Sequence, residues 1–188
     1  MKAWKESKAW KAWQHYKTIT KHRTLVTLGC FRLGLIWQGL IHDFSKYSWT
    51  EFSVGIKYYQ GDRSPNNAER EDRGSSQAWL HHKGRNKHHF EYWLDYSEQS
   101  ADVVRGMKMP RKYVAEMICD RLAACKVYQK EAYTPESPLK YYLRGKGQFF
   151  MNPKTREELE MILEMIGKEG EEKTFEYIKN VYLKGLDI

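Results

Sequence analysis

The stretch "VAEMICDRLAAC", residues 114–125, indicates the fold class. Four apolar side chains in it recur at i, i+4, i+8 and i+11, the spacing of one face of an α-helix: Val114, Ile118, Leu122 and Cys125. The helix should begin soon after Pro110, because proline is tolerated at the start of a helix and disrupts its interior. We therefore expect a strong helix here, with one apolar face.

Helical spacing continues through most of the chain, which holds only five prolines in 188 residues. Residues 1–21 predict a basic leading helix rich in Trp and Lys, and residues 24–41 predict a buried helix. Arg32, Gln38 and three glycines interrupt the second segment, so we do not expect it to span a membrane. The prediction for residues 1–188 is a single all-α domain.

Near the end of the chain, "PKTREELEMILEMI", residues 153–166, predicts a helix whose N-terminal cap is Thr155. Glu158, three residues further on, would complete a capping box. Two segments rich in turn-forming residues predict irregular structure. Residues 61–76 should form an exposed loop or a lid, and residues 133–148 a second irregular connection.

The net charge of +8 is concentrated at the start of the chain, where residues 1–23 hold seven Lys or Arg against one Glu. A basic segment favours an anionic partner such as a nucleotide, a nucleic acid or a membrane surface. A solvated helix face explains the same charges, and the Trp residues of this helix could also pack on a second subunit of a homodimer. His15, on the same helix, is expected to face solvent.

The cysteines are three in number and form no Cys-x-x-Cys pair: Cys30, Cys119 and Cys125. This number and spacing of cysteines are typical of a protein in a reducing compartment, where the side chains stay as buried free thiols. The opening segment lacks the apolar core of a signal peptide, so the expected location is the cytoplasm.

The string "HDFSKYSWTEF", residues 42–52, carries the first candidate chemistry. His42 and Asp43 follow an apolar helix, so an imidazole and a carboxylate could share an ion at its end. Lys46 lies about one helical turn after Asp43. Its ammonium group could face a ligand that is bound to the shared ion.

The string "HHKGRNKHH", residues 81–89, sets four histidines among basic residues. One interpretation is a solvated basic loop, and the other is a metal site, because imidazole is a common ligand of divalent ions. Gly84 makes one continuous helix improbable, so we expect two helix ends that meet across a short turn.

The "HDFSK" string resembles the His-Asp-x-Gly-Lys string of HD-domain metal phosphohydrolases, whose ligands occur in the order His, His-Asp and a distant Asp. The resemblance implies an HD-domain-like helical bundle and a first ion held by four residues: His22, His42, Asp43 and Asp120. Binuclear members place further histidines in the interval, which implies a second ion, with Asp43 bridging. One histidine of each pair is then expected to bind it: His81 or His82, and His88 or His89. Residues 20–166 also resemble a bacterial and phage family of unassigned function.

These observations predict a phosphohydrolase with one or two Mn, Fe, Co, Ni or Zn ions, acting on a nucleotide or a related small phosphoester. Asp43, Lys46 and Arg85 are the predicted catalytic residues, the two cations neutralising substrate phosphate. Two alternatives stay open. One is an HD-like di-iron oxygenase, and the other is a non-catalytic protein that binds nucleic acid through its basic leading helix and uses the metal structurally.

Overall fold

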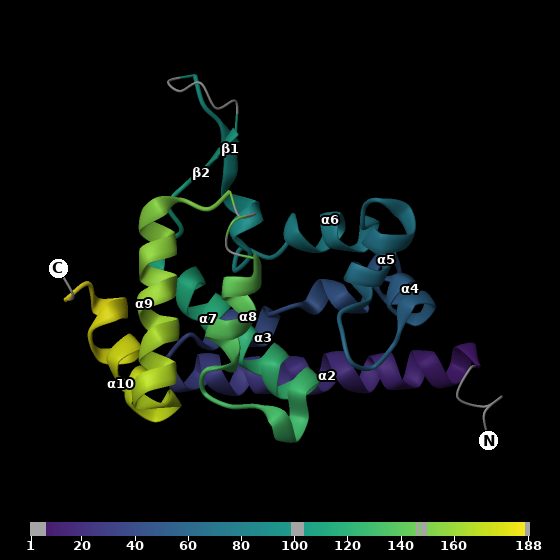
Figure 1. Ribbon diagram of the computed structural model, residues 1–188, viewed down its shortest axis with the longest axis horizontal. Helices are drawn as coiled ribbons and strands as arrows, with labels where there is room; N and C mark the ends of the chain where they lie inside the picture. The colour runs from purple at the N-terminus through teal and green to yellow at the C-terminus, as the bar shows by residue number, and fades with distance from the viewer. Residues whose placement is uncertain (1–6, 99–103, 146, 148–149, 187–188) are drawn as a thin grey trace.

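The structure, a computed structural model, describes residues 7–98, 104–145, 147 and 150–186. In this part of the chain the protein is all-α apart from one two-stranded hairpin, as predicted (Figure 1). The α-helices are α2 (Lys8–Arg32), α3 (Ile36–Ile41), α4 (Trp49–Tyr58), α5 (Pro65–Arg73), α6 (Gln77–Lys83), α7 (Arg111–Gln129), α8 (Ser137–Gly145), α9 (Pro153–Glu169) and α10 (Glu171–Asn180). Short 3₁₀ turns are η1 (Phe44–Tyr47), η2 (Phe90–Trp93), η3 (Lys130–Ala132) and η5 (Tyr182–Lys184). None of the described helices is both long and apolar enough to cross a membrane.

Helix α7 forms the centre of the core. All four residues of its predicted apolar face are buried, which confirms the pattern. Helices α2, α8, α9 and α10 supply most of the other core side chains (Figure 1). The three cysteines are free thiols and all are buried, as expected for small apolar side chains.

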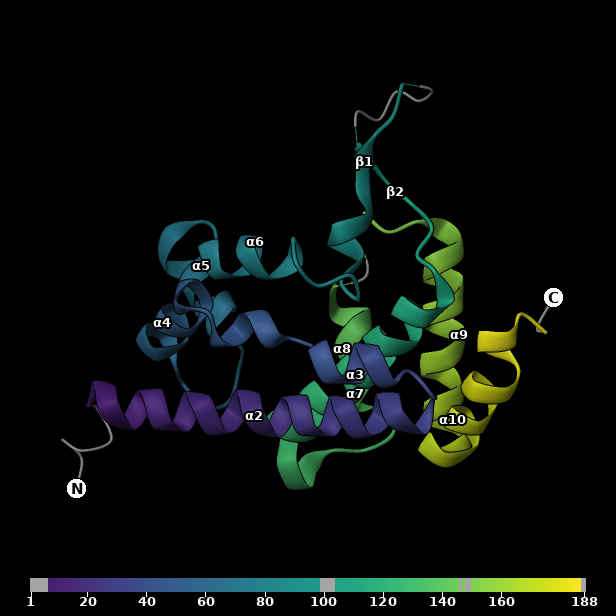
Figure 2. The ribbon, with the colours of Figure 1, turned by 180° about the vertical axis from the view of Figure 1, so that it is seen from behind.

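Helix α2 runs along one side of the molecule (Figure 2) and begins where the Ser7 hydroxyl accepts a hydrogen bond from the Trp10 backbone N–H at 3.1 Å. Its buried residues recur at helical spacing: His15, Ile19, His22, Val26 and Cys30. The prediction that His15 faces solvent is therefore wrong. Its ring shares the inner face with Ile19 and packs on Gly55 of α4.

The stretch 24–41 does not form one buried helix. Helix α2 ends at Arg32, and the chain turns through Gly34, whose φ of 78° lies in the left-handed region that glycine tolerates. The short helix α3 then lies alongside the second half of α2, where Thr27 donates to the carbonyl of Gly39 at 2.8 Å. Most of the apolar side chains of α3 remain exposed as a result.

Both segments predicted to be irregular contain helices. Pro65 occupies the first turn of α5, and the buried Glu69 accepts a hydrogen bond from Ser76 at 2.6 Å within the segment. Glu69 also accepts from the backbone N–H of Ala78 at 3.3 Å, which joins residues 61–76 to α6. Helix α8 occupies most of the second segment. The predicted capping box is also wrong, because Asn152 caps α9 and its side chain accepts from the backbone N–H of Thr155.

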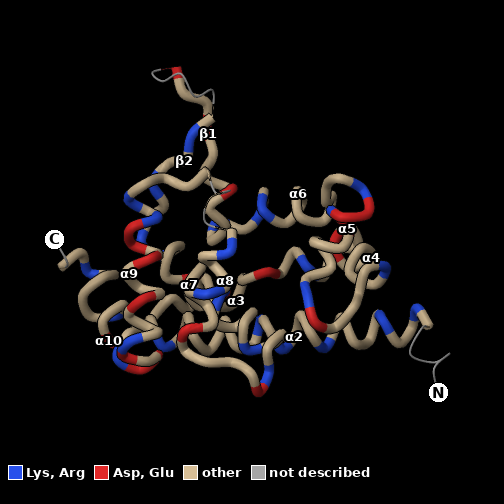
Figure 3. The backbone as a smooth tube through the Cα atoms, in the orientation of Figure 1, with Lys and Arg blue, Asp and Glu red and all other residues tan. Residues whose placement is uncertain are grey.

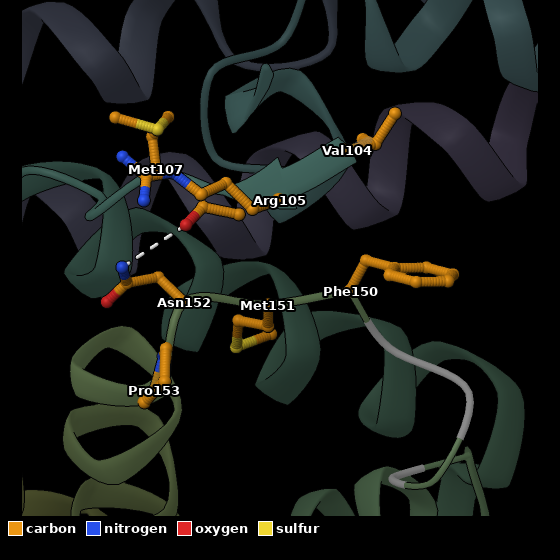
Figure 4. Close-up of a pocket in the computed structure, with 8 residues that line it drawn as sticks. Val104, Arg105, Met107, Phe150, Met151, Asn152 and Pro153 are labelled. Atoms are coloured by element: carbon orange, nitrogen blue, oxygen red, sulfur yellow. Dashed lines mark hydrogen bonds between the residues drawn. The ribbon is translucent and has the colours of Figure 1, made fainter. Parts of the chain in front are cut away.

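The hairpin pairs β1 (Leu94–Tyr96) with β2 (Val104–Gly106) in antiparallel register and projects from the helical body (Figure 1). A pocket lies where β2 meets the segment before α9, and Asn152 donates from its side chain to the Gly106 carbonyl there (Figure 4). The residues that line this pocket include none of the predicted site residues.

Candidate metal centre

The His-Asp pair lies at the junction between α3 and η1. His42 follows the last residue of α3, and Asp43 has a φ of 52°, in the left-handed region that few residues other than glycine adopt. Aspartate tolerates this conformation better than most, although it still costs on the order of 1 kcal/mol. The turn directs both side chains inward, since Asp43 is fully buried and His42 nearly so.

The four residues predicted for the first ion come together. Their ligand atoms all lie within 4.8 Å of one another: His22, His42, Asp43 and Asp120. His22 Nε2 is 3.0 Å from Asp120 Oδ1 and 3.4 Å from Asp43 Oδ2, and His42 Nε2 is 3.4 Å from the same Asp43 oxygen. Helix α2, the α3–η1 turn and helix α7 thus each contribute to one cluster.

A second cluster forms on the other oxygen of Asp43. It contains Asp43, His82, His88 and His89. His82 Nε2 lies 3.2 Å and His88 Nε2 3.5 Å from Asp43 Oδ1. Asp43 therefore belongs to both clusters and offers a different oxygen to each, which is the arrangement predicted for a bridging carboxylate.

One histidine of the first pair and both histidines of the second pair belong to the second cluster. Helix α6 turns adjacent side chains about 100° apart, so His82 enters the cluster while His81 pairs outside it with Glu51, at 2.7 Å. His88 and His89 lie between the end of α6 and η2, outside any helix. Their rings are 4.1 Å apart, and both belong to the cluster.

Several buried polar atoms in the clusters have no hydrogen-bond partner of acceptable geometry among the described residues: Nε2 of His22, His42, His88 and His89, and Oδ1 of Asp43. The other oxygen of Asp43, Oδ2, pairs with Lys46. A buried polar atom without a partner costs about 1 to 3 kcal/mol. Divalent cations between these atoms would satisfy them together. The donor set therefore fits metal ions better than it fits a hydrogen-bonded core.

Two carboxylates that the sequence reasoning missed hold the far side of the imidazoles. Glu116 Oε1 lies 2.9 Å from His42 Nδ1 and 3.1 Å from His88 Nδ1. Glu51 Oε2 lies 2.9 Å from His82 Nδ1. Carboxylates in this position fix the tautomer and orientation of a ligating imidazole and raise its basicity. The sequence signal for Glu116 was its place one turn before Asp120 in an otherwise apolar stretch of helix.

The electrostatics of the clusters keep the carboxylates ionised. Burial on its own would raise the pKa of Asp43, but His42, Lys46 and His82 hold that pKa well below its usual range. The pKa of Asp120 is likewise held low, against the effect of burial, by His22 and His42, whose Nε2 atoms lie 3.0 and 3.5 Å from its Oδ1. Burial lowers the pKa of His89 well below its ordinary value, with His88 and His82 acting in the same direction. Against the effect of burial, Asp43 and the other neighbouring carboxylates raise the pKa of His42 and of His82. Ionised carboxylates and neutral imidazoles are the forms that bind metal, so His42 and His82 would release a proton on binding an ion, whereas His89 is already neutral.

The two predicted catalytic cations differ in position. Lys46 Nζ is 2.5 Å from Asp43 Oδ2, and its side chain is partly exposed, so it connects the clusters to the surface. Arg85 is exposed, and its guanidinium donates back to the carbonyl of His81 at 3.1 Å. Its backbone N–H donates to the carbonyl of His82 at 3.0 Å, but no described side-chain contact joins Arg85 to either cluster.

Fold and site together define an all-α protein with a buried cluster of histidines and carboxylates, of the composition that binds divalent metals. The chain belongs to the family described as "Family of unknown function (DUF5662)", which matches residues 11–165. This agrees with the predicted membership in a family of unassigned function. Searches of the curated proteins and of the solved structures gave no match.

Proposed function

We propose that this protein is a divalent-metal-dependent phosphohydrolase of the HD-domain type, acting on a nucleotide or a related small phosphoester. The observation that carries the proposal is the position of Asp43. Each of its two oxygens faces the Nε2 atoms of two histidines, and Lys46 contacts one of those oxygens. A carboxylate shared in this way suits two adjacent cations, and Lys46 suits the anion that they would bind.

Mixed imidazole and carboxylate ligands favour Mn, Fe, Co, Ni or Zn over Mg. Such ions, when bound, supply an acidified water and polarise phosphoryl oxygens. The chain's own residues account for the remaining requirements. Asp43 and Asp120 balance the positive charge of the ions, while Glu116 and Glu51 hold the imidazoles in one orientation.

Lys46 is the residue that would neutralise substrate phosphate. Burial alone would lower its pKa, but Asp43 and Asp120 raise that pKa above its ordinary value, so the ammonium stays charged throughout the physiological range. Its partial exposure, together with that of Asp120, makes this edge of the clusters the side that a substrate would approach. A fixed cation at that edge stabilises the negative charge that develops on a phosphoryl group.

The test uses protein purified without a histidine tag, stripped by a chelator and reloaded separately with each of the five metals. Phosphate release is then measured from p-nitrophenyl phosphate, bis-p-nitrophenyl phosphate and a panel of nucleoside mono-, di- and triphosphates. We expect metal-dependent release from at least one of these compounds. His82→Ala should abolish it, and His81→Ala, which alters the adjacent histidine outside the clusters, should retain it. Protein that is fully loaded with metal and inert toward the whole panel contradicts the proposal.

A second function fits the same ligands. Five imidazoles and two carboxylates, one of which is the shared Asp43, also suit a pair of iron ions that activate oxygen. The position of Lys46 favours hydrolysis over oxidation, because a cation at the open edge of the clusters would neutralise the charge of a substrate phosphate. Oxygen consumption by the iron-loaded protein, unaffected by Lys46→Met and accompanied by no phosphate release, would decide for the oxygenase.

A further inference from the structure

A strip of aromatic rings links the first half of α2 to η1 on the outside of the molecule. The Trp13 and Tyr16 rings stack with centroids 5.8 Å apart, and Tyr16 meets the Tyr47 ring edge-on at 6.1 Å. Tyr47 in turn lies 6.1 Å from the ring of Phe44. Residues far apart in sequence therefore form one continuous strip, which ends beside Asp43.

The outer face of α3 extends this strip with aliphatic side chains. The inner face of α3 lies on α2 at Gly39, where an added Cβ would lie 3.2 Å from the Phe31 ring, so the two helices adjoin closely. Figure 2 shows α3 alongside the second half of α2. The exposed apolar residues of this region are Leu28, Phe31, Ile36, Trp37, Leu40, Ile41, Phe44 and Trp49. Trp37, Phe44 and Trp49 are 69%, 66% and 76% exposed, far more than such side chains usually are in a soluble protein.

Basic residues recur along the same elements, as the blue segments of α2 in Figure 3 show. Of these residues, only Arg32 and Lys46 pair with an acidic side chain that the structure describes, Glu172 and Asp43 respectively. Lys17 lies over the ring of Trp13 and Arg23 over that of Phe44, with centroid distances of 5.7 and 5.4 Å. Arg23 also donates to the His42 carbonyl at 2.8 Å, which fixes its guanidinium at the end of α3. The Lys and Arg residues between 7 and 49 are Lys8, Lys11, Lys17, Lys21, Arg23, Arg32 and Lys46. The one acidic residue in that range, Asp43, is buried in the metal clusters.

We infer that the face formed by α2, α3 and η1 docks on the surface of a membrane that contains anionic lipids. Exposed Trp and Phe side chains beside Lys and Arg suit the boundary between lipid head groups and acyl chains. The aliphatic side chains of Leu28, Ile36 and Leu40 suit contact with acyl chains. The charged backbone of a nucleic acid offers no apolar surface for them to contact. A second copy of this chain is a poorer occupant, because a two-fold dimer through this face would set its cations against the same cations of the partner.

The experiment is flotation of the full chain with vesicles of phosphatidylcholine, with and without 30 mol% phosphatidylserine. We expect binding to the anionic vesicles at 0.1 M salt, and binding at least about tenfold weaker to the neutral ones. Trp37→Ser combined with Leu40→Ser should weaken binding by at least about tenfold, because both side chains lose apolar area that the membrane would cover. Lys17→Glu combined with Lys21→Glu should weaken it through charge alone.

The matched control is Tyr141→Ser combined with Leu143→Ser on α8, which removes two large side chains of similar exposure from another helix. This variant should float like the wild type. Circular dichroism melting of each variant identifies any that fail to fold, and the Lys17 and Lys21 pair then provides the second test. Wild-type protein that does not float, or floats equally well when Trp37 and Leu40 are replaced, overturns the inference. So does a dimer that only this face holds together, or binding to duplex DNA alone.

Discussion

His42 Nδ1 lies 2.9 Å from an oxygen of Glu116, a residue 74 positions later in the chain. The same oxygen lies 3.1 Å from His88 Nδ1, although His42 and His88 direct their Nε2 atoms at opposite oxygens of Asp43. One carboxylate of α7 therefore orients an imidazole in each metal cluster. The two clusters are coupled on both sides, through Asp43 between them and through Glu116 behind them.

Replacing Glu116 should weaken both ion positions at once. Glu116→Gln keeps the size of the side chain but removes the charge that orients His42 and His88, so we expect about 10- to 100-fold weaker binding of both metals. Glu51→Gln is the matched control, since Glu51 contacts only His82 among the cluster histidines. It should weaken one metal and spare the other. Calorimetric titration of the metal-free protein with metal ions measures both affinities. A Glu116→Gln protein that keeps one of the two affinities unchanged would contradict this coupling.

The two aspartates of the clusters should differ in how many ions depend on them. Asp43→Asn removes a charge that both clusters share, so we expect the metal content to fall from two equivalents to none. Asp120→Asn removes a charge from the first cluster alone and should leave one equivalent. Elemental analysis of the three proteins, prepared in parallel, counts the ions. Equal metal content in the two variants would show that Asp43 is not a bridge.

The sequence predicted those parts of the site that repeat along one element or stand next to each other. The apolar face of α7 needed only spacing, and His42 and Asp43 are adjacent, whereas the choice of His22 and Asp120 needed the ligand order of the HD-domain proteins that the "HDFSK" string resembles. The choice between His81 and His82 needed the phase of α6 relative to Asp43, which depends on how α4 and α6 pack. Periodicity within one segment carries no information on that packing.

Residues whose role arises between elements were missed for the same physical reason. Glu51 and Glu116 look like ordinary helix residues in the sequence, and only the fold places them behind the imidazoles. His15 looked exposed because the residues around it are basic, yet a helix buries one face regardless of the charge on the other. The outer face of α3 was wrongly assigned to the core, since hydrophobicity alone does not distinguish a buried face from an exposed apolar one.

Lys46 should affect turnover without affecting metal content. Lys46→Gln removes the cation at the open edge while the histidines and Asp120 stay in place. If the proposed phosphohydrolase activity is found, we expect two metal equivalents and a fall of about 10²-fold in kcat/KM for the phosphoester that is hydrolysed. Lys57→Gln, which alters an exposed lysine paired with Asp72, should leave kcat/KM unchanged. Loss of metal from the Lys46 variant would show that Lys46 holds the metal site together and would contradict its role in binding substrate phosphate.

His15 should make folding stability depend on pH. Burial lowers its pKa from 6.5 to about 4, with a smaller contribution from the charge of Lys46, so the folded protein holds a neutral imidazole. Between those values the unfolded chain binds a proton that the folded chain does not, so stability falls as the pH falls. From pH 7 to pH 5 the wild type should lose about 2 kcal/mol more than His15→Leu. Urea unfolding of the two proteins at equal metal loading measures the difference in the free energy of unfolding. Equal pH dependences of the two proteins would show that the protonation of His15 does not affect folding stability.

Gly55 should be required only because His15 is present. A Cβ added at Gly55 would overlap the His15 ring, whose Nε2 is the nearest atom. Gly55→Ala should therefore destabilise the protein by about 1 to 3 kcal/mol, the usual cost of overpacking.

In a His15→Ala background the imidazole ring is absent. The same Gly55→Ala substitution in the middle of α4 should then stabilise the protein by up to about 1 kcal/mol, because alanine favours a helix more than glycine does. Gly167→Ala in α9, where the nearest side-chain atom would be in ordinary contact at 3.5 Å, is the control for helix propensity alone. Thermal unfolding of the single and double variants gives the coupling between the two positions. A cost at Gly55 that persists without the imidazole would mean that the backbone at Gly55, and not the His15 ring, excludes a larger residue.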